Sequence, residues 1–239
     1  MPPNGVLEIG PGIGVLTAEL ARRARKVVAL ELDRRLLPVL SETLADFDNV
    51  EIVNEDVLKA DLRAILKERF AGMEVSICAN LPYYITSPVI MRLLEERLPF
   101  RSITVMVQKE AAERLCAPVG SREAGAVTVA VQYYAQAEKL FSVSRGSFLP
   151  APNVDSAVIR LQIRQAPAVA LTDEKKFFRM VKAAFGQRRK TALNAISAGM
   201  ALPKGDVAAA LEAAGLEGNV RAEKLSMEEL AALCEALPG

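Results

Sequence analysis

The chain has 239 residues, a formal net charge of +1 and no histidine. Without histidine, a Ser-His-Asp triad, a Cys-His pair and an imidazole metal ligand are all excluded. The three cysteines, Cys78, Cys116 and Cys234, lie far apart and form no zinc-binding spacing, so we expect no metal site and a cytoplasmic location. The composition, 51% apolar and 25% charged, is that of a globular protein without a membrane-spanning run.

Strands and helices are predicted to alternate along the first two thirds of the chain. We expect strands at residues 6–10, 26–31, 50–54, 75–80, 103–108, 127–134 and 156–163. We expect helices at residues 16–24, 34–44, 62–69, 88–97 and 109–116. This alternation predicts an α/β fold with a mostly parallel sheet, in which the last two strands form an antiparallel pair.

A helical region is predicted after a linker at residues 165–168. Its expected helices are residues 173–185, 190–198, 204–214 and 226–236, which gives an α/β domain at 1–166 and a small all-helical domain at 167–239. Residues 160–191 carry nine Lys or Arg against two Asp or Glu, whereas the preceding residues carry 18 against 20. This segment is either a polyanion-binding face or a solvated helix.

A glycine-rich loop containing Gly10, Gly12 and Gly14 follows the first predicted strand. Glycines allow a tight turn and let a ligand approach backbone N–H groups. The third glycine comes one residue earlier than in a dinucleotide-binding G-x-G-x-x-G, and no Lys-Ser pair follows as in a P-loop. The loop resembles motif I of S-adenosylmethionine-dependent methyltransferases, and the resemblance implies that Glu8 helps to hold the amino group of the cofactor. A glycine turn without a ligand is the alternative.

Acidic residues follow the next two predicted strands. Glu31 ends the second strand, where a carboxylate can accept hydrogen bonds from both ribose hydroxyls, although Asp33 is a rival. Asp56 follows the third strand, and in the resembled family an Asp at this place binds the adenine amino group. A helix cap is the other interpretation of Asp56. Because the carboxyl ends of parallel strands meet at one edge, these residues predict a cofactor site there.

The segment Asn80-Leu81-Pro82-Tyr83 follows the fourth predicted strand and is the most informative in the chain. The lone pair of an exocyclic base nitrogen is delocalised into the ring, so this nitrogen attacks poorly. An Asn side-chain oxygen and a backbone carbonyl can accept its two hydrogens and favour a more tetrahedral nitrogen. Pro82 stiffens the loop, and Tyr83 can stack on an extruded base. A turn with a packed tyrosine is the alternative.

The Asn-Leu-Pro-Tyr form resembles the bacterial KsgA/RsmA family of ribosomal RNA adenine-N6,N6-dimethyltransferases. The resemblance also rests on residues 84–88, 107–110, 131–134, 148–158 and 185–191, and it runs from Val6 to the end of the chain. It implies a Rossmann-like class I methyltransferase sheet with an antiparallel last strand, and S-adenosylmethionine as cofactor. The implied reaction is dimethylation of two adjacent adenosines in the 3′-terminal hairpin loop of 16S rRNA, in the immature small subunit.

The resemblance assigns further roles. Asn80 would also contact the cofactor, and Phe148 would stack on the target adenine opposite Tyr83. The alternative for Phe148 is a core aromatic. RNA phosphates would be bound by Arg188, Arg189 and Lys190, for which a solvated basic run is the alternative. The chain departs from the family in two ways: we expect that an N-terminal segment closing over the cofactor is missing, and Ala124 stands where the family often has Tyr.

Three other functions fit parts of this pattern. A macrolide-resistance dimethyltransferase would act on large-subunit RNA, but residues 154–156 and the basic run at 187–190 argue against it. A non-catalytic ribosome-assembly factor would keep the fold and the RNA face, and tight cofactor binding would count against this class. A Rossmann-like domain with another nucleotide ligand is the remaining alternative. We expect the protein to be a monomer.

Overall fold

The computed structural model describes residues 4–149, 151–187 and 189–238. Their contacts divide the chain into two compact units, which we call the sheet unit (Met1–Ala112 with Ala137–Ile163) and the helical unit (Glu113–Gln136 with Arg164–Gly239). The helical unit thus takes in residues 113–136, and the functional division at residue 166 stays a prediction. No helix in the described part of the chain is long and apolar enough to cross a membrane.

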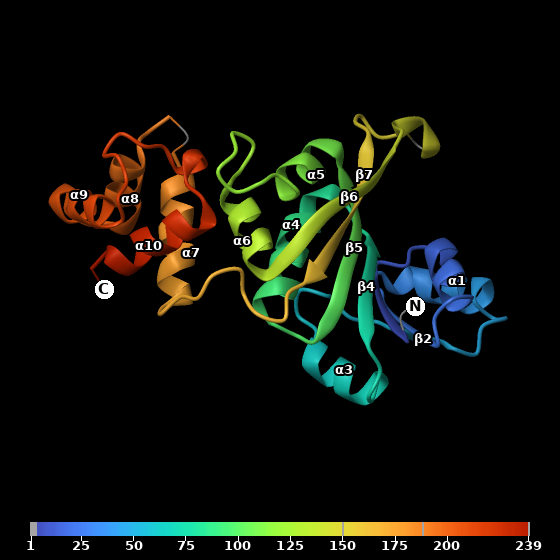
Figure 1. Cartoon of the computed structure of the whole chain (residues 1–239). Coiled ribbons are helices and arrows are strands. Elements are labelled where there is room, and N and C mark those ends of the chain that lie inside the picture. The colour runs from blue at the N-terminus through green and yellow to red at the C-terminus, as the bar shows by residue number, and fades with distance from the viewer. Residues whose placement is uncertain (1–3, 150, 188, 239) are drawn as a thin grey trace. The chain divides into compact units, whose positions relative to one another are not determined.

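The described residues form one seven-stranded sheet with the order β3-β2-β1-β4-β5-β7-β6 (Figure 1). Strands β1 to β5 pair in parallel, and β7 runs antiparallel to β5. This confirms the predicted Rossmann-like sheet, mostly parallel with an antiparallel last part. The strands are β1 Gly5–Ile9, β2 Lys26–Leu30, β3 Val50–Val53, β4 Val75–Asn80, β5 Phe100–Gln108, β6 Ala135–Val143 and β7 Ser156–Ile163.

The strand register brings several chain segments to one edge of the sheet. Ile9 of β1 lies opposite both Leu30 of β2 and Ala79 of β4, so these three strands end at the same level. Because β7 is antiparallel, it begins where β5 ends, with Ser156 opposite Gln108. We call this edge the carboxyl edge. It gathers the loops that follow β1, β2, β3 and β4 and the loop that precedes β7.

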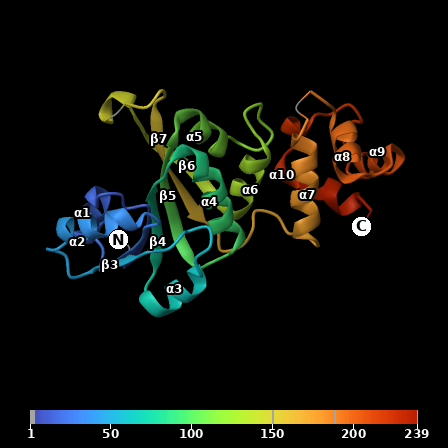
Figure 2. The same cartoon turned by 180° about the vertical axis from the view of Figure 1, so that it is seen from behind.

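The helices of the sheet unit are α1 Val15–Ala21, α2 Leu37–Thr43 preceded by a 3₁₀ turn at Arg34–Leu36, α3 Leu62–Arg69 and α4 Tyr83–Glu95. Helix α1 packs on β2, and one buried cluster contains Ala21 of α1, Ala24 of the following turn and Val27 of β2. Helix α4 packs on β5, and views from opposite sides show it over one face of the sheet (Figures 1 and 2). It begins five residues earlier than predicted, since Pro82 is its N-cap and Pro88 lies inside it.

The predicted strand at 127–134 is wrong, because these residues form helix α6, Ala126–Tyr134, after helix α5, Lys109–Leu115. The helix begins where the N–H of Gly125 donates to Thr128 Oγ1 at 2.9 Å. Most of its side chains are buried, and the hydroxyls of Tyr133 and Tyr134 both donate to the Glu174 carboxylate. The strand is the next segment, β6, so β7 has β5 and β6 as neighbours rather than residues 127–134.

The helical unit confirms the four predicted C-terminal helices within a few residues. They are α7 Glu174–Phe185, α8 Ala192–Met200, α9 Lys204–Ala213 and α10 Met227–Ala236 (orange to red in Figure 1). Asp173 caps α7 by accepting from the N–H of Lys176, and Ser226 and Glu229 form a capping box on α10. A Cβ on Gly199 of α8 would lie 2.5 Å from Ala183 Cβ, so a glycine there lets α7 and α8 approach closely.

Candidate functional site

The glycine loop leaves open space beside its backbone at the carboxyl edge. Gly10, Gly12 and Gly14 have φ angles of 70°, 60° and 90°, a region that side chains other than glycine rarely adopt. The loop is held by a hydrogen bond from the N–H of Gly10 to the Leu30 carbonyl at 3.0 Å. A Cβ on Gly12 would meet no atom within 4 Å. A ligand can therefore lie directly against this part of the loop.

Glu8 is a buried carboxylate, and one of its two oxygens has no hydrogen bond among the described residues. It is 1% exposed in β1, and the oxygen without a hydrogen bond is Oε2. Burial raises the pKa of Glu8 to about 7, and the nearby Thr17 hydroxyl lowers it by a smaller amount. A buried carboxylate of this kind needs a donor or a cation to be stable when ionised. The amino group of S-adenosylmethionine fits this requirement, so the residues present suit the cofactor.

Glu31 and Asp56 follow neighbouring strands, but their side chains accept different hydrogen bonds. Glu31 is 6% exposed and accepts the N–H of Asp33 through Oε1 at 2.7 Å. Asp33 pairs with Arg35, which lowers the pKa of Asp33 to about 2, so Asp33 is the less suitable ribose ligand. Asp56 accepts the N–H of Leu58 at 2.9 Å and thus caps a turn. The ribose and adenine contacts of Glu31 and Asp56 stay predictions.

The Asn-Leu-Pro-Tyr segment lies next to the glycine loop. Asn80 is the last residue of β4 and is exposed, whereas Leu81 is 4% exposed. A Cβ built on Gly10 would lie 3.7 Å from Leu81 Cδ2. The Pro82 carbonyl accepts from the N–H of Ile85 and from the Thr86 hydroxyl, and so starts α4. The structure thus places Asn80 at the carboxyl edge, beside the glycine loop.

The two candidate stacking residues, Tyr83 and Phe148, both belong to the carboxyl edge. Tyr83 is half-buried in the first turn of α4, and its hydroxyl lies 2.7 Å from Ser156 Oγ. Phe148 is half-buried and follows a 3₁₀ turn at Arg145–Ser147 that precedes β7. No ring contact between Tyr83 and Phe148 is recorded in the described residues. Stacking of a base between the two rings stays a prediction.

Two residues at this edge were not anticipated from the sequence. Asn54 donates to the Glu31 carbonyl at 2.7 Å and accepts from Arg34 Nε at 3.0 Å, so it links the ends of β2 and β3. Ser156 links β7 to α4 through Tyr83. A polar residue directly after a buried strand is a usable signal for Asn54. Ser156 lies in the segment 148–158 that resembles the family, but no role was predicted for its side chain.

The basic run is only partly described. Arg188 lies outside the described residues, while Arg189 and Lys190 are exposed in the turn between α7 and α8. The N–H of Lys190 donates to the Gln187 carbonyl at 2.9 Å. No salt bridge to Arg189 or Lys190 is recorded in the described part of the chain. Both cations are therefore accessible to an anionic ligand, but RNA contact stays a prediction.

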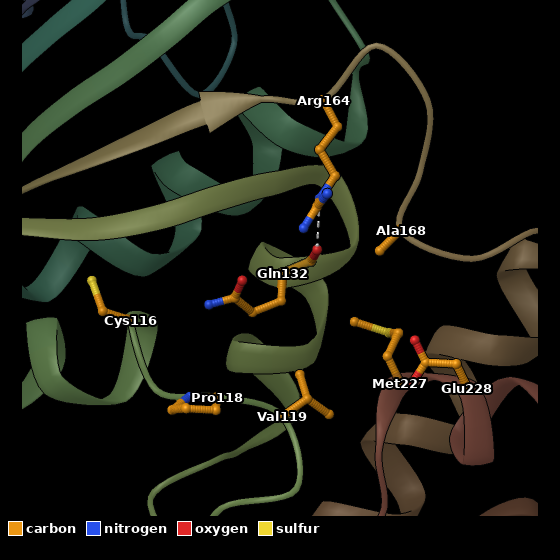
Figure 3. Close-up of a pocket in the computed structure, with 8 residues that line it drawn as sticks. All are labelled: Cys116, Pro118, Val119, Gln132, Arg164, Ala168, Met227 and Glu228. Carbon is orange, nitrogen blue, oxygen red and sulfur yellow. Dashed lines mark hydrogen bonds between the residues drawn. The ribbon is translucent and has the colours of Figure 1, made fainter.

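A pocket of about 540 Å³ lies within the helical unit, and none of the predicted site residues lines it (Figure 3). Arg164 points to Gln132 and donates through Nε to its backbone carbonyl at 3.2 Å. The other lining residues are Cys116, Pro118, Val119, Ala168, Met227 and Glu228. No predicted residue connects this pocket with methyl transfer.

A sheet of this order, with a glycine loop after β1 and an exposed Asn at the end of β4, is that of an S-adenosylmethionine-dependent methyltransferase. The thiol of Cys78, opposite Glu8, has its pKa raised to about 11 by burial and by the Glu8 charge, so it is no activated nucleophile.

Residues 2–238 match the family model for ribosomal RNA adenine dimethylase. The chain belongs to this family, whose members use S-adenosylmethionine.

Relatives of known function support this assignment. The chain is 54% identical to the ribosomal RNA small subunit methyltransferase A of Geobacillus thermodenitrificans, over 98% of this chain and 81% of that protein. It is 51% identical to the protein of the same name from Bacillus licheniformis, over 98% and 82%.

Two solved structures resemble the whole chain. The 23S rRNA methyltransferase ErmE is 31% identical, with a TM-score of 0.72 over 99% of this chain and 91% of that one. A dimethyladenosine transferase from Plasmodium falciparum is 25% identical, with a TM-score of 0.75 over 97% and 89%. Both likenesses extend over the sheet and the C-terminal helices.

Proposed function

We propose that this protein dimethylates N6 of two adjacent adenosines in the 3′-terminal hairpin loop of 16S rRNA. The observation that carries the proposal is the position of Asn80. It stands exposed at the end of β4, level with the strand end that leads into the glycine loop. A base amino group presented there would lie beside the cofactor.

The chemistry follows from the residues of the carboxyl edge. When bound, S-adenosylmethionine supplies an electrophilic methyl group. The Asn80 side-chain oxygen and a backbone carbonyl of the same loop accept the two N–H hydrogens of the adenine. This directs the nitrogen lone pair out of the ring plane, and Tyr83 and Phe148 hold the base by stacking. The positively charged product nitrogen loses its proton readily, so the reaction needs no histidine base.

The choice of the small rather than the large ribosomal subunit as substrate rests on the sequence identity of this chain to its relatives. The small-subunit relatives are 54% and 51% identical over 98% of the chain, whereas ErmE, which acts on 23S rRNA, is 31% identical. The substrate we propose is therefore the immature small subunit. The exposed cations Arg189 and Lys190 would contact its phosphates. We further propose that the protein is a cytoplasmic monomer. Its methyltransferase domain would be residues 1–166 and its RNA-binding domain residues 167–239.

Methylation assays with Asn80→Ala test this function. Undermethylated small and large subunits would be supplied separately with radiolabelled S-adenosylmethionine. We expect the unaltered protein to label only the small subunit, and the variant to label neither. Because Asn80 is exposed, its truncation should leave the free energy of unfolding unchanged, which urea unfolding checks. Full activity of the variant would refute the mechanism, and labelling of large subunits alone would refute the substrate.

Cofactor binding distinguishes the proposed enzyme from a non-catalytic assembly factor. Calorimetry of the unaltered protein with S-adenosylmethionine should detect binding at one site per chain. A protein that binds small subunits but neither binds nor consumes the cofactor would be an assembly factor instead.

A further inference from the structure

The first residue of β7, Ser156, is a fully buried polar residue with a specific partner. Its side chain is 0% exposed, and Oγ lies 2.7 Å from the hydroxyl of Tyr83, which is 73 residues away in the chain. Such a bond is shielded from water and therefore holds its geometry well. It fixes the outer end of the Tyr83 ring, whose inner end is attached to the first turn of α4.

The preceding residue, Asp155, reaches two other segments of the carboxyl edge. Its carbonyl accepts from the N–H of Lys109 at 3.0 Å, the first residue of α5, directly after β5. Its Oδ1 accepts from the N–H of Arg145 at 3.0 Å, at the start of the 3₁₀ turn that leads to Phe148. Residues 155 and 156 therefore tie together the segments that carry the two candidate stacking rings.

We propose that Asp155 and Ser156 are positioning residues for the methyl transfer, because they fix Tyr83 and the turn before Phe148 relative to each other. This inference rests on the proposed function. The two rings define the slot for the target base, so a shift of either ring moves the amino group away from the cofactor. Displacements of about 1 Å cost on the order of a hundredfold in rate in enzymes that depend on positioning. Neither Asp155 nor Ser156 needs to touch the substrate.

The Tyr83–Ser156 bond is tested with Tyr83→Phe, Ser156→Ala and the double variant. Tyr83→Phe keeps the stacking ring and removes only the hydroxyl. We expect each single variant to lower kcat on undermethylated small subunits about tenfold, as for the loss of one hydrogen bond. The double variant should be no slower than either single variant, since the same bond is lost. The Kd for S-adenosylmethionine should not change.

A spectroscopic measurement separates positioning from general destabilisation. An RNA hairpin with 2-aminopurine at the target position would be titrated with each variant. Stacking on Tyr83 quenches its fluorescence, so Tyr83→Phe and Ser156→Ala should quench less than the unaltered protein. If Ser156→Ala does not fold, Tyr83→Phe removes the same bond from the half-buried side. Unchanged kcat and quenching in Tyr83→Phe, or losses that multiply in the double variant, would overturn the role of Ser156.

Asp155 offers a matched pair of substitutions. Asp155→Asn keeps an oxygen that accepts from the N–H of Arg145, whereas Asp155→Ala removes it. We expect wild-type kcat for Asp155→Asn and a several-fold lower kcat for Asp155→Ala. Equal rates for both would overturn the role of the side chain. All comparisons use an unaltered protein that methylates small subunits; if that protein is inactive, the proposed function itself fails.

Discussion

Leu81 lies next to Gly10, since a Cβ built on Gly10 would lie 3.7 Å from Leu81 Cδ2. Leu81 follows Asn80 in the chain, and Gly10 begins the glycine loop that we propose as part of the cofactor site. The two loops follow adjacent parallel strands, β4 and β1, and these strands end at the same level. In the proposed function, this buried leucine lies beside both the residue that orients the base and the loop that holds the methyl donor.

Truncation of Leu81 should therefore affect cofactor binding as well as folding. Leu81→Ala creates a cavity at a site that is 4% exposed, so we expect a loss of about 2–5 kcal/mol in the free energy of unfolding. We also expect a higher Kd for S-adenosylmethionine by calorimetry. Leu93→Ala in α4 is the matched control, since Leu93 is 2% exposed but has no atom within 4 Å of a Cβ built on Gly10 or Gly12. Equal effects of both variants on Kd would contradict the role of Leu81.

Glu8 should make the stability of the cofactor-free protein depend on pH. The folded-state pKa is raised from 4.5 to about 7, so the unfolded chain loses its proton at lower pH than the folded protein does. Stability should therefore fall as the pH rises from about 4.5 to 7 and level off above it, with a total change of about 3 kcal/mol at most. Urea unfolding of the protein and of Glu8→Gln across this range measures the effect.

The Glu8→Gln variant lacks this titration, so its stability advantage over the unaltered protein should grow with pH. Added S-adenosylmethionine should reverse the order at pH 8, because its amino group then pairs with the ionised Glu8. Parallel pH profiles for the two proteins would show that the Glu8 carboxyl is not the source of the dependence.

The exposed cations Arg189 and Lys190 should contribute to RNA affinity in a salt-dependent way. Replacing both with Ala should weaken binding to a 16S hairpin and lower the slope of log K against log salt by about 1.5, as expected for two phosphate contacts. The Kd for S-adenosylmethionine should stay the same. Arg63→Ala with Lys67→Ala, at exposed positions of α3, is the control. An unchanged salt slope would remove the basic run from the RNA interface.

The motifs at the strand ends could be predicted because they depend on local sequence. Gly10, Glu31 and Asn80 each follow an apolar run that is recognisable as a buried parallel strand, and the topology then brings them to one edge. Helix α6 could not be predicted in this way. Its valines and tyrosines favour a strand, but burial in the helical unit outweighs that preference, and a short apolar run shows no period that separates the two.

The bond between Tyr83 and Ser156 is a second feature that the sequence does not reveal. The two residues are 73 positions apart, and each is compatible with many surroundings. Their proximity follows from β7 running antiparallel to β5, which returns the chain to the carboxyl edge. The sequence predicted that the sheet ends in antiparallel strands, but not which side chains this arrangement brings together.

The buried carboxylate of Glu8 also bears on turnover. If Glu8 holds the amino group of the methyl donor, it meets the same group in S-adenosylhomocysteine, because demethylation changes only the sulfur. An interaction of equal strength before and after the transfer raises affinity without accelerating the chemical step. Each dimethylation requires repeated exchange of the spent donor for a fresh one. The affinity that Glu8 adds would thus slow this exchange, and product inhibition is its consequence.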